Sequence, residues 1–488
     1  MVTSGRLPKE LALLRAKVAS SILRVLRIEG SSMIKITKFG GSSVSSAGQF
    51  KKVKAIVQAD PSRRFVVVSA AGKRDKFDSK ITDLLYLVNA HLQYHVTCDD
   101  LLGTIGQRFC EIAKELNLSY PISQEFGIFR ELAKRGEYTP EYIVSRGEYF
   151  TGRMMAEYLG FPFVDAADVI TFRPDSSIDM DKTAEKLKAA IGEEKCFVLP
   201  GFYGATEDGK IKLLDRGGGD ITGAIVAQCL GADLYENWTD VSGFLTADPR
   251  IVDNPKSISR ITYAELRELS YMGASVLHEE AIFPVKDAGI PLVIKNTNAP
   301  DDPGTVISEE TEPGVAEPLI TGIAGKKDFI AIHVKTNHMS SKVGYIRKTL
   351  SIFERYRVSI EHIPTGIDSF AVVVQGSDVK DCLYSIVADI KSELEPDEIK
   401  IVDRLALIST VGRNMPSRPG TSGRLFGELG HAGINIRMIA QGSEELDIVV
   451  GVDVDDFERA IRVIYGAFVD SDDNIITVEE AEEEATNE

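Results

Sequence analysis

The chain has 488 residues, of which 43% are hydrophobic and 26% are charged, and its formal net charge at pH 7 is −17. This composition is typical of a soluble globular protein of about three domains, and the negative charge argues against nucleic acid or a membrane surface as a partner. Five widely spaced cysteines without a Cys-x-x-Cys pair indicate neither a disulfide framework nor a zinc site, so a reducing, cytoplasmic location is expected.

Residues 1–32 form a basic amphipathic segment that differs from the sequence after it. The segment would serve as a transit peptide, as a surface helix, or as an extension upstream of the protein's own start. We favour the extension, because a predicted strand at residues 34–38 begins directly after Met33.

This first strand runs into the bend Gly40-Gly41-Ser42-Ser43, and a helical pattern follows over residues 46–58. Lys38 lies at the bend. Glycines let backbone N–H groups approach an anion, a helix N-terminus adds a favourable dipole, and a lysine supplies positive charge. The stretch therefore predicts a phosphate site, although an ordinary strand-to-helix turn has the same pattern.

From Met33 to about Val306, predicted strands and helices alternate. The further strands are residues 65–69, 161–165, 196–200, 233–237 and 292–295, and the helices are residues 81–95, 142–159, 183–191 and 221–230. Such alternation predicts an α/β fold with a mostly parallel sheet covered by helices. Ligands of such sheets bind beyond the carboxyl ends of the strands, where the glycine-rich turns of this chain fall.

A second glycine-rich turn, Arg216-Gly217-Gly218-Gly219-Asp220, opens a predicted helix. Two such turns suit a phosphoryl group that is held from both sides. The structural alternatives are a helix N-cap for Asp220 and a surface ion pair for Arg216. By contrast, most of a Walker A loop at residues 204–210 is better explained by a hairpin turn at Asp208-Gly209, because Ile211 stands where Ser or Thr is needed.

Two more motifs are candidate ligand contacts. Glu148, in Ser145-Arg146-Gly147-Glu148, would face a ligand amine or remain a solvated helix carboxylate. The segments Trp238-Thr239-Asp240 and Asp248-Pro249-Arg250 follow the strand that ends at Asn237, and they would hold a nucleotide. The alternative for them is a turn beside a buried indole.

A turn-rich, acidic stretch over residues 298–318 predicts a domain boundary, and an internal repeat follows it. Residues 339–363 align without gaps on residues 415–439. Each copy has a leading strand (330–334, 405–410), an inner strand (358–363, 434–439), a trailing strand (370–374, 446–452) and a second helix (379–394, 457–468). The pattern predicts paired small sandwiches that bind a small ligand at their interface or only dimerise. A strand at residues 474–478 is expected to complete the first copy's sheet.

Taken in order, the motifs resemble those of the aspartokinase family, and the repeat resembles its tandem ACT domains. The motifs are residues 38–44, 145–148, 216–220, 238–241, 248–250 and 272–278, and their order and approximate spacing agree from Met33 to the C-terminus. The resemblance implies an amino-acid-kinase fold over residues 33–308 and two ferredoxin-like ACT domains. These are residues 319–400, completed by residues 471–480, and residues 402–470, before an acidic tail at residues 479–488.

The implied reaction transfers the γ-phosphoryl group of ATP to the side-chain carboxylate of L-aspartate. The product, 4-phospho-L-aspartate, is the first intermediate toward lysine, threonine and methionine. By the same resemblance, Lys38 would neutralise the migrating group and Asp220 would orient Lys38 or Mg²⁺, which ATP phosphates mainly hold. The implied substrate contacts are Thr82, Glu148, Arg216 and Gly219, and the implied nucleotide contacts are Lys38, Gly40, Gly41, Ser42, Thr239, Asp240, Arg250, Ser275 and Val276.

The ACT pair implies feedback control by lysine or threonine and a homodimer or higher oligomer formed through these domains. The matching effector positions are Met339, Gly344, Tyr345 and Thr365. Leu245 and Ser275 depart from the family's tyrosine and lysine, and Gly366 and Ile367 replace a Ser-Glu pair, which leaves the effector open. Alternatives are a kinase for another amino acid, such as glutamate, and an amino-acid sensor with an inactive kinase domain. Lys38, Arg216 and Asp220 argue against the sensor.

Overall fold

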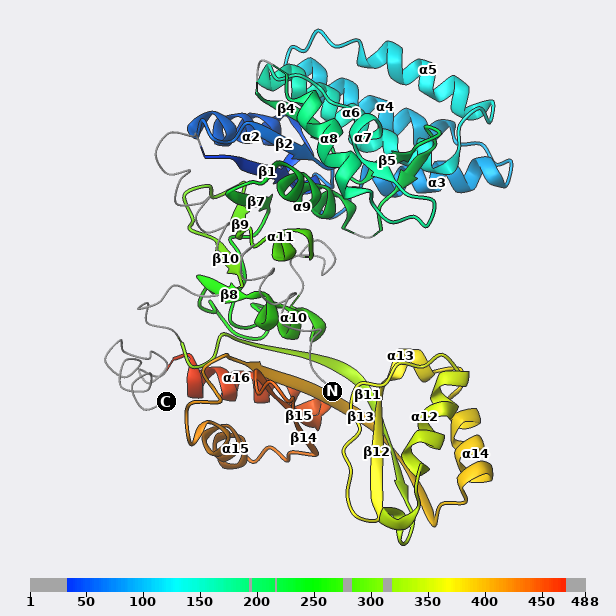
Figure 1. The fold of residues 1–488 in the computed structure, drawn as a ribbon, viewed down its shortest axis with the longest axis vertical. Helices are drawn as coiled ribbons and strands as arrows, with labels where there is room; N and C mark the ends of the chain where they lie inside the picture. The colour runs from blue at the N-terminus through cyan, green and yellow to red at the C-terminus, as the bar shows by residue number, and fades with distance from the viewer. Residues whose placement is uncertain (1–32, 193–194, 216, 275–282, 310–317, 471–488) are drawn as a thin grey trace, which may run out of the picture.

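The computed structural model describes residues 33–192, 195–215, 217–274, 283–309 and 318–470 (Figure 1). The larger part contains a seven-stranded sheet in the order β4-β2-β1-β7-β9-β10-β8. Its strands are β1 (Lys35–Phe39), β2 (Phe65–Val68), β4 (Phe197–Pro200), β7 (Leu234–Thr239), β8 (Arg260–Thr262), β9 (Leu292–Asn296) and β10 (Thr305–Ser308). Every neighbouring pair is parallel except β9 and β10, which confirms the predicted mostly parallel sheet.

Helices cover both faces of this sheet. The helices of this part are α2 (Ala47–Ala59), α3 (Ile81–Gln93), α4 (Asp99–Glu115), α5 (Ile122–Lys134), α6 (Pro140–Leu159), α7 (Ala166–Val169), α8 (Met180–Ala190), α9 (Gly218–Leu230), α10 (Tyr263–Tyr271) and α11 (Phe283–Asp287), of which α5 packs on α4. Successive residues of a strand point to opposite faces. Accordingly, Phe65 and Val67 pack in one core with α9, whereas Val66 and Val68 pack in the other with α2, α4 and α6. A fully buried apolar strand is what a covered parallel sheet requires.

The structure differs from two predictions about local structure and confirms a third. The strand predicted at residues 161–165 is wrong: Phe163 forms an isolated bridge with Val198, and Asp165 then caps α7. The inner strand predicted at residues 358–363 is reduced to a bridge between His362 and Val373. The hairpin predicted at Asp208-Gly209 is confirmed, because β5 (Tyr203–Thr206) and β6 (Ile211–Leu213) pair antiparallel beside β3 (Thr171–Phe172).

The two C-terminal repeats share one antiparallel sheet in the order β12-β11-β13-β15-β14. Its strands are β11 (Gly322–Lys335), β12 (Ser369–Gln375), β13 (Glu398–Val411), β14 (Met438–Gln441) and β15 (Asp447–Asp453), and its helices are α12 (Tyr345–Arg355), α13 (Gly376–Val379), α14 (Leu383–Leu394), α15 (Thr421–His431) and α16 (Phe457–Phe468). The long strands β11 and β13 pair along both repeats and join them (Figure 1). The strand predicted at residues 474–478 lies outside the described residues.

A hairpin-like loop between β7 and β8 reaches from the larger part of the structure into the second repeat. Ala247 and Val252 belong to the hydrophobic core of that repeat. The Tyr465 hydroxyl on α16 accepts a hydrogen bond from the Lys256 amide at 3.0 Å, and the Thr246 carbonyl accepts one from the Ile323 amide at 2.7 Å. This part of the loop therefore packs against the sheet of the two repeats.

Helix α10 forms a second junction through Glu265, which has no exposed surface. One carboxylate oxygen accepts from the Thr321 hydroxyl at 2.5 Å and from the Arg413 amide at 3.2 Å, while the other caps α10 through Thr262. Replacing Glu265 by alanine is expected to lower the free energy of unfolding by about 3–5 kcal/mol, because these buried donors lose their acceptor.

Urea unfolding, followed by the fluorescence of Trp238, measures the loss. Glu265→Gln keeps one acceptor oxygen and should lose less than the alanine variant. An alanine variant as stable as the wild type would contradict this function of Glu265.

Candidate active site

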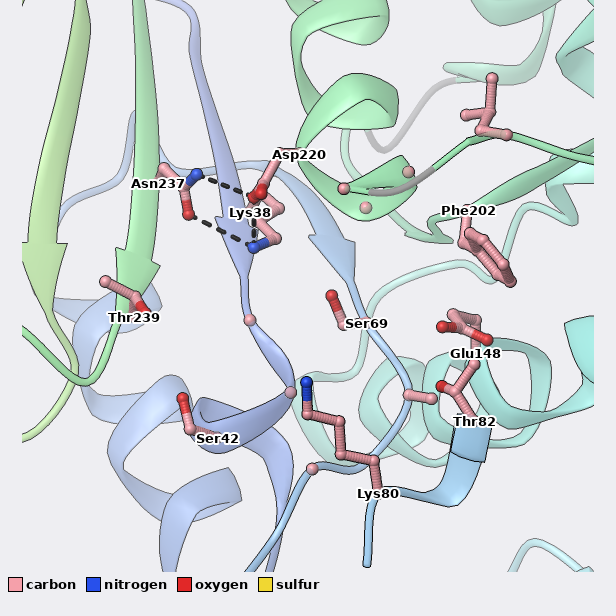
Figure 2. A pocket seen from close by; sticks show the side chains of 18 of the residues that line it. Lys38, Ser42, Ser69, Lys80, Thr82, Glu148, Phe202, Asp220, Asn237 and Thr239 are labelled. Atoms are coloured by element: carbon pink, nitrogen blue, oxygen red, sulfur yellow. Dashed lines mark hydrogen bonds and ion pairs between the residues drawn. The ribbon is translucent and has the colours of Figure 1, made fainter. Parts of the chain in front are cut away.

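A pocket of about 1010 Å³ lies at the carboxyl ends of β1, β2 and β7 (Figure 2). The position agrees with the expectation for an open parallel sheet. Ten residues predicted to contact ligands line it together: Lys38, Gly40, Gly41, Ser42, Thr82, Glu148, Gly219, Asp220, Thr239 and Asp240. These residues come from segments as far apart as the first strand and β7, so the fold brings the separate motifs to one place.

The bend after β1 is held by close backbone contacts. The Gly40 amide donates to the Trp238 carbonyl at 2.9 Å, and the Gly72 amide donates to the Gly41 carbonyl at 2.8 Å. A Cβ atom on Gly72 would lie 2.5 Å from the carbonyl carbon of Gly41, so only glycine fits there. A short 3₁₀ turn, Gly41–Val44, follows the bend, and α2 begins only after its N-cap Ser46. The helix therefore begins where the sequence pattern predicted, and the 3₁₀ turn separates its N-terminus from the bend.

Helix α9 directs Asp220 at Lys38 across the pocket. The N-cap of α9 is Gly217, whose φ of 82° favours glycine, so the interpretation of Asp220 as N-cap is wrong. The Asp220 carboxylate instead lies 2.5 Å from the Lys38 amine and accepts a hydrogen bond from the Asn237 amide nitrogen at 2.8 Å. The Asn237 carbonyl oxygen in turn lies 3.4 Å from the Lys38 amine. The three side chains, drawn together in Figure 2, fix the lysine amine inside the pocket.

The opposite wall of the pocket carries Glu148, on α6, beside Thr82 in the first turn of α3 (Figure 2). Gly147 allows the two helices to meet, because a Cβ atom there would lie 3.2 Å from a Leu85 methyl carbon and 3.4 Å from one of Ile81, both on α3. Glu148 is buried, and its Oε2 atom has no hydrogen-bond partner among the described residues. Burial raises the pKa of Glu148 to about 8, although hydrogen bonds from Ala70 and Thr82 oppose the shift. A buried carboxylate with an unpaired oxygen fits a cationic group of a ligand.

The structure describes one of the other four predicted contacts, and that one is not part of the pocket. Arg250 does not line it; its guanidinium is exposed and lies 2.6 Å from the Asp248 carboxylate. Arg216, Ser275 and Val276 lie outside the described residues. The structure adds residues that sequence reasoning missed, namely Ser69, Lys73, Lys80 and Asn237. Asn237 pairs in register with Lys38 across β1 and β7. This contact could not be predicted from the sequence, because the order of the strands in the sheet was not known.

The predicted effector residues lie in the first repeat. Met339 and Tyr345 are buried in its core, and the Tyr345 ring meets the Phe370 ring edge to face at 6.2 Å. Gly344 caps α12 with a φ of 79°, and Thr365 is exposed in the segment before β12. The role of these four residues in binding an effector is a prediction.

Other features of the described chain bear on its chemistry. All five cysteines are free thiols. No helix in the described ranges is long and apolar enough to cross a membrane. The same ranges contain no group of three or more His, Cys, Asp and Glu side chains placed to bind a metal ion.

Comparison with known proteins gives the same family along most of the chain. Residues 33–296 match the amino acid kinase family, and residues 408–468 match an ACT domain. Aspartokinase 3 of Bacillus subtilis (strain 168) is 35% identical over 449 residues, which cover 89% of this chain and 98% of the relative.

Solved structures agree. The aspartate kinase of Clostridium acetobutylicum is 47% identical and superposes with a TM-score of 0.84 over 90% of this chain and 100% of its own. Aspartokinase III of Escherichia coli, solved with aspartate and ADP in the R-state, is 25% identical with a TM-score of 0.67 over 89% of this chain and 99% of its own. The same enzyme with lysine and aspartate in the T-state is 25% identical with a TM-score of 0.70 over 90% of this chain and 100% of its own. This chain belongs to the aspartokinases, phosphotransferases of the amino acid kinase family that carry ACT domains.

Proposed function

We propose that this chain transfers the γ-phosphoryl group of ATP to the side-chain carboxylate of L-aspartate and forms 4-phospho-L-aspartate and ADP. The observation that carries the proposal is the pairing of two opposite features in one pocket. Glu148 offers an unpaired, buried carboxylate oxygen on one wall, and Lys38 offers a fixed cation on the other. A zwitterionic acid with an ammonium at one end and a reacting carboxylate at the other complements this arrangement.

In the proposed reaction, the ammonium of aspartate binds Glu148, and Thr82, Gly219 and Arg216 contact the rest of the substrate. The β-carboxylate is already ionised at pH 7, so no general base is needed. One of its oxygens forms a bond to the γ-phosphorus, and the bond to the bridging oxygen breaks, which leaves its electron pair on ADP. Lys38 and the backbone N–H groups of Gly40, Gly41 and Ser42 stabilise the negative charge on the transferred group.

The nucleotide is proposed to bind on the side of the pocket formed by the end of β7. Thr239 and Asp240 line it there, and Arg250, Ser275 and Val276 remain predicted contacts. Mg²⁺ is expected to accompany ATP, held mainly by phosphate oxygens, because Mg²⁺ commonly takes one or two carboxylates together with substrate phosphates. Asp220 and Asp240 line the pocket and are carboxylates of the required kind. The ion would neutralise phosphate charge.

The ACT domains are proposed to bind lysine or threonine near Met339, Gly344, Tyr345 and Thr365 and to reduce activity as feedback on the pathway to lysine, threonine and methionine. The E. coli enzyme solved with lysine in a T-state supports lysine as the first candidate. Such control requires that the effector bind one global state better than the other. Association of ACT domains into a homodimer or higher oligomer, in a reducing cytoplasm, is part of the same proposal.

Incubation with ATP, L-aspartate and hydroxylamine tests the reaction, because hydroxylamine traps an acyl phosphate as a coloured hydroxamate. We expect hydroxamate with L-aspartate and little with L-glutamate. Product from glutamate alone would make the chain a different amino-acid kinase. No product from either acid, together with binding of lysine or threonine, would make it a sensor.

A further inference from the structure

Two lysines of the loop from Gly72 to Lys80 lie at the pocket, and neither has a role in the proposed mechanism. Lys73 and Lys80 both line the pocket, and in Figure 2 the amine of Lys80 points toward the bend that carries Ser42. Lys80 is the residue before α3, where its carbonyl accepts a hydrogen bond from the Leu84 amide at 3.1 Å. Its backbone is therefore fixed one residue before Ile81 and two before the substrate-side Thr82.

The lining of the pocket carries more negative than positive charge, so a further free lysine would help it to bind phosphate groups. Its described lining contains five acidic residues and three lysines. Lys38 already forms an ion pair with Asp220 at 2.5 Å. Among the described residues, no carboxylate lies within 4.0 Å of the Lys80 amine, so none of them neutralises its charge. Phosphoryl transfer depends mainly on positioning and on neutralising the charge of the transferred group.

A buried arginine closes the loop that carries Lys80. Arg108, on α4, is 2% exposed and donates hydrogen bonds to the carbonyls of Gly72 at 2.5 Å and Ser79 at 2.6 Å. It also lies 3.5 Å from the Asp78 carboxylate. The guanidinium thus joins both ends of the loop, while the Ile81 amide donates to the Ala71 carbonyl at 3.1 Å.

Burial of this guanidinium is unfavourable, and it lowers the pKa of Arg108. The contacts of Arg108 lie at the two ends of one loop, and the start of that loop is bonded to the phosphate-binding bend through Gly72 and Gly41. These hydrogen bonds therefore fix the position of the loop and its lysines relative to the bend after β1.

We propose that Lys80 is a second catalytic lysine that contacts the γ-phosphoryl group between the bend after β1 and the acceptor side, and that Arg108 is the residue that positions it. The inference rests on the proposed function, since it assigns Lys80 to the transferred group of that reaction. Lys80 would contact the transferred group between ATP and aspartate, whereas Lys38 would contact it from β1.

Lys80→Met removes the charge and keeps the length of the side chain. We expect kcat to fall at least about tenfold with the KM for L-aspartate changed less than about threefold, because the contact is strongest when charge moves onto the transferred group. Lys76→Met is the matched control: Lys76 lies on the same loop, outside the pocket lining, with its amine 5.0 Å from the Phe77 ring centroid. Equal kcat values for the two variants would overturn the assignment of Lys80.

Comparing the effect of Arg108→Lys on kcat with and without Lys80 tests whether Arg108 acts by positioning Lys80. We expect Arg108→Lys to lower kcat in the wild-type background and to have less than about a twofold effect in the Lys80→Met background, since the lysine that Arg108 positions is then absent. An equal loss of kcat in both backgrounds would show a merely structural role. If Arg108→Lys fails to fold, Asp78→Asn loosens the same loop and is judged by the same comparison.

Binding separates this inference from the proposed function. Calorimetry with a non-hydrolysable ATP analogue and with ADP needs no turnover. Lys80→Met should weaken the ATP analogue at least about fivefold and ADP less than about twofold, because only the analogue carries a γ-phosphate. A wild type that forms no hydroxamate would refute the proposed function, whereas equal changes for the two nucleotides would refute the contact from Lys80.

Discussion

Replacing Lys38 by alanine is expected to lower kcat by at least about 10³-fold, because one fixed cation that stabilises the transferred group is worth this much in comparable sites. Lys38 is buried, and among the described residues its amine is held by Asp220 and Asn237. The loss should appear in the kcat that is measured with both ATP and L-aspartate at saturating concentrations. Binding of lysine or threonine should persist, because the predicted effector residues lie in a different domain.

Lys35→Ala is the matched control for this variant. Lys35 lies on the same strand but forms its ion pair with Asp60 at 2.7 Å and does not line the pocket. Its loss should lower stability with little change in kcat. A Lys38→Ala enzyme with near-normal kcat would show that the role given to Lys38 is wrong.

The second large effect is expected for Glu148→Gln, which keeps the shape of the side chain and removes its charge. The KM for L-aspartate should rise roughly 100-fold, since a hydrogen bond between charged groups contributes about 1.5–3 kcal/mol. Saturating aspartate should restore much of kcat, because in the proposed mechanism Glu148 holds the ammonium and does not touch the reacting atoms. Glu141→Gln, an exposed position on the same helix, is the control and should leave KM unchanged.

The pH dependence of KM follows from the same residue. Burial places the pKa of Glu148 at about 8 in the free enzyme, and a bound ammonium would lower that pKa, because an opposite charge favours the ionised carboxylate. Below pH 8 the free enzyme must lose a proton before it binds aspartate in this way. The KM for L-aspartate should therefore fall by roughly tenfold per pH unit between pH 6 and 8 and then level off. A wild-type KM that is constant over this range would contradict the role of Glu148.

Much of this fold and site was predictable from the sequence. Strand-and-turn alternation placed β1, β2, β4, β7 and β9 correctly, and the motifs at residues 38–42, 148 and 219–220 meet in one pocket. Local patterns are sufficient here, because apolar runs followed by glycines mark the strand ends where parallel sheets bind ligands.

The wrong predictions concern residues whose local structure is determined by tertiary contacts. Asp220 has the local sequence of an N-cap, yet it forms an ion pair with a lysine on the first strand of the chain. The apolar run at residues 161–165 looks like a strand, but Phe163 packs against Gly152 of α6 instead of joining a ladder. The clamp of Arg108 on Gly72 and Ser79 spans up to 36 residues and leaves no local pattern.

The most direct test of the account is the number of protons that the enzyme releases when it binds L-aspartate at pH 7, measured by calorimetry in two buffers with different ionisation enthalpies. If the substrate ammonium binds the buried Glu148, whose pKa burial raises to about 8, a large part of one proton should leave each site, and the Glu148→Gln enzyme should release none. Binding of aspartate to the wild-type enzyme without proton release would contradict the account.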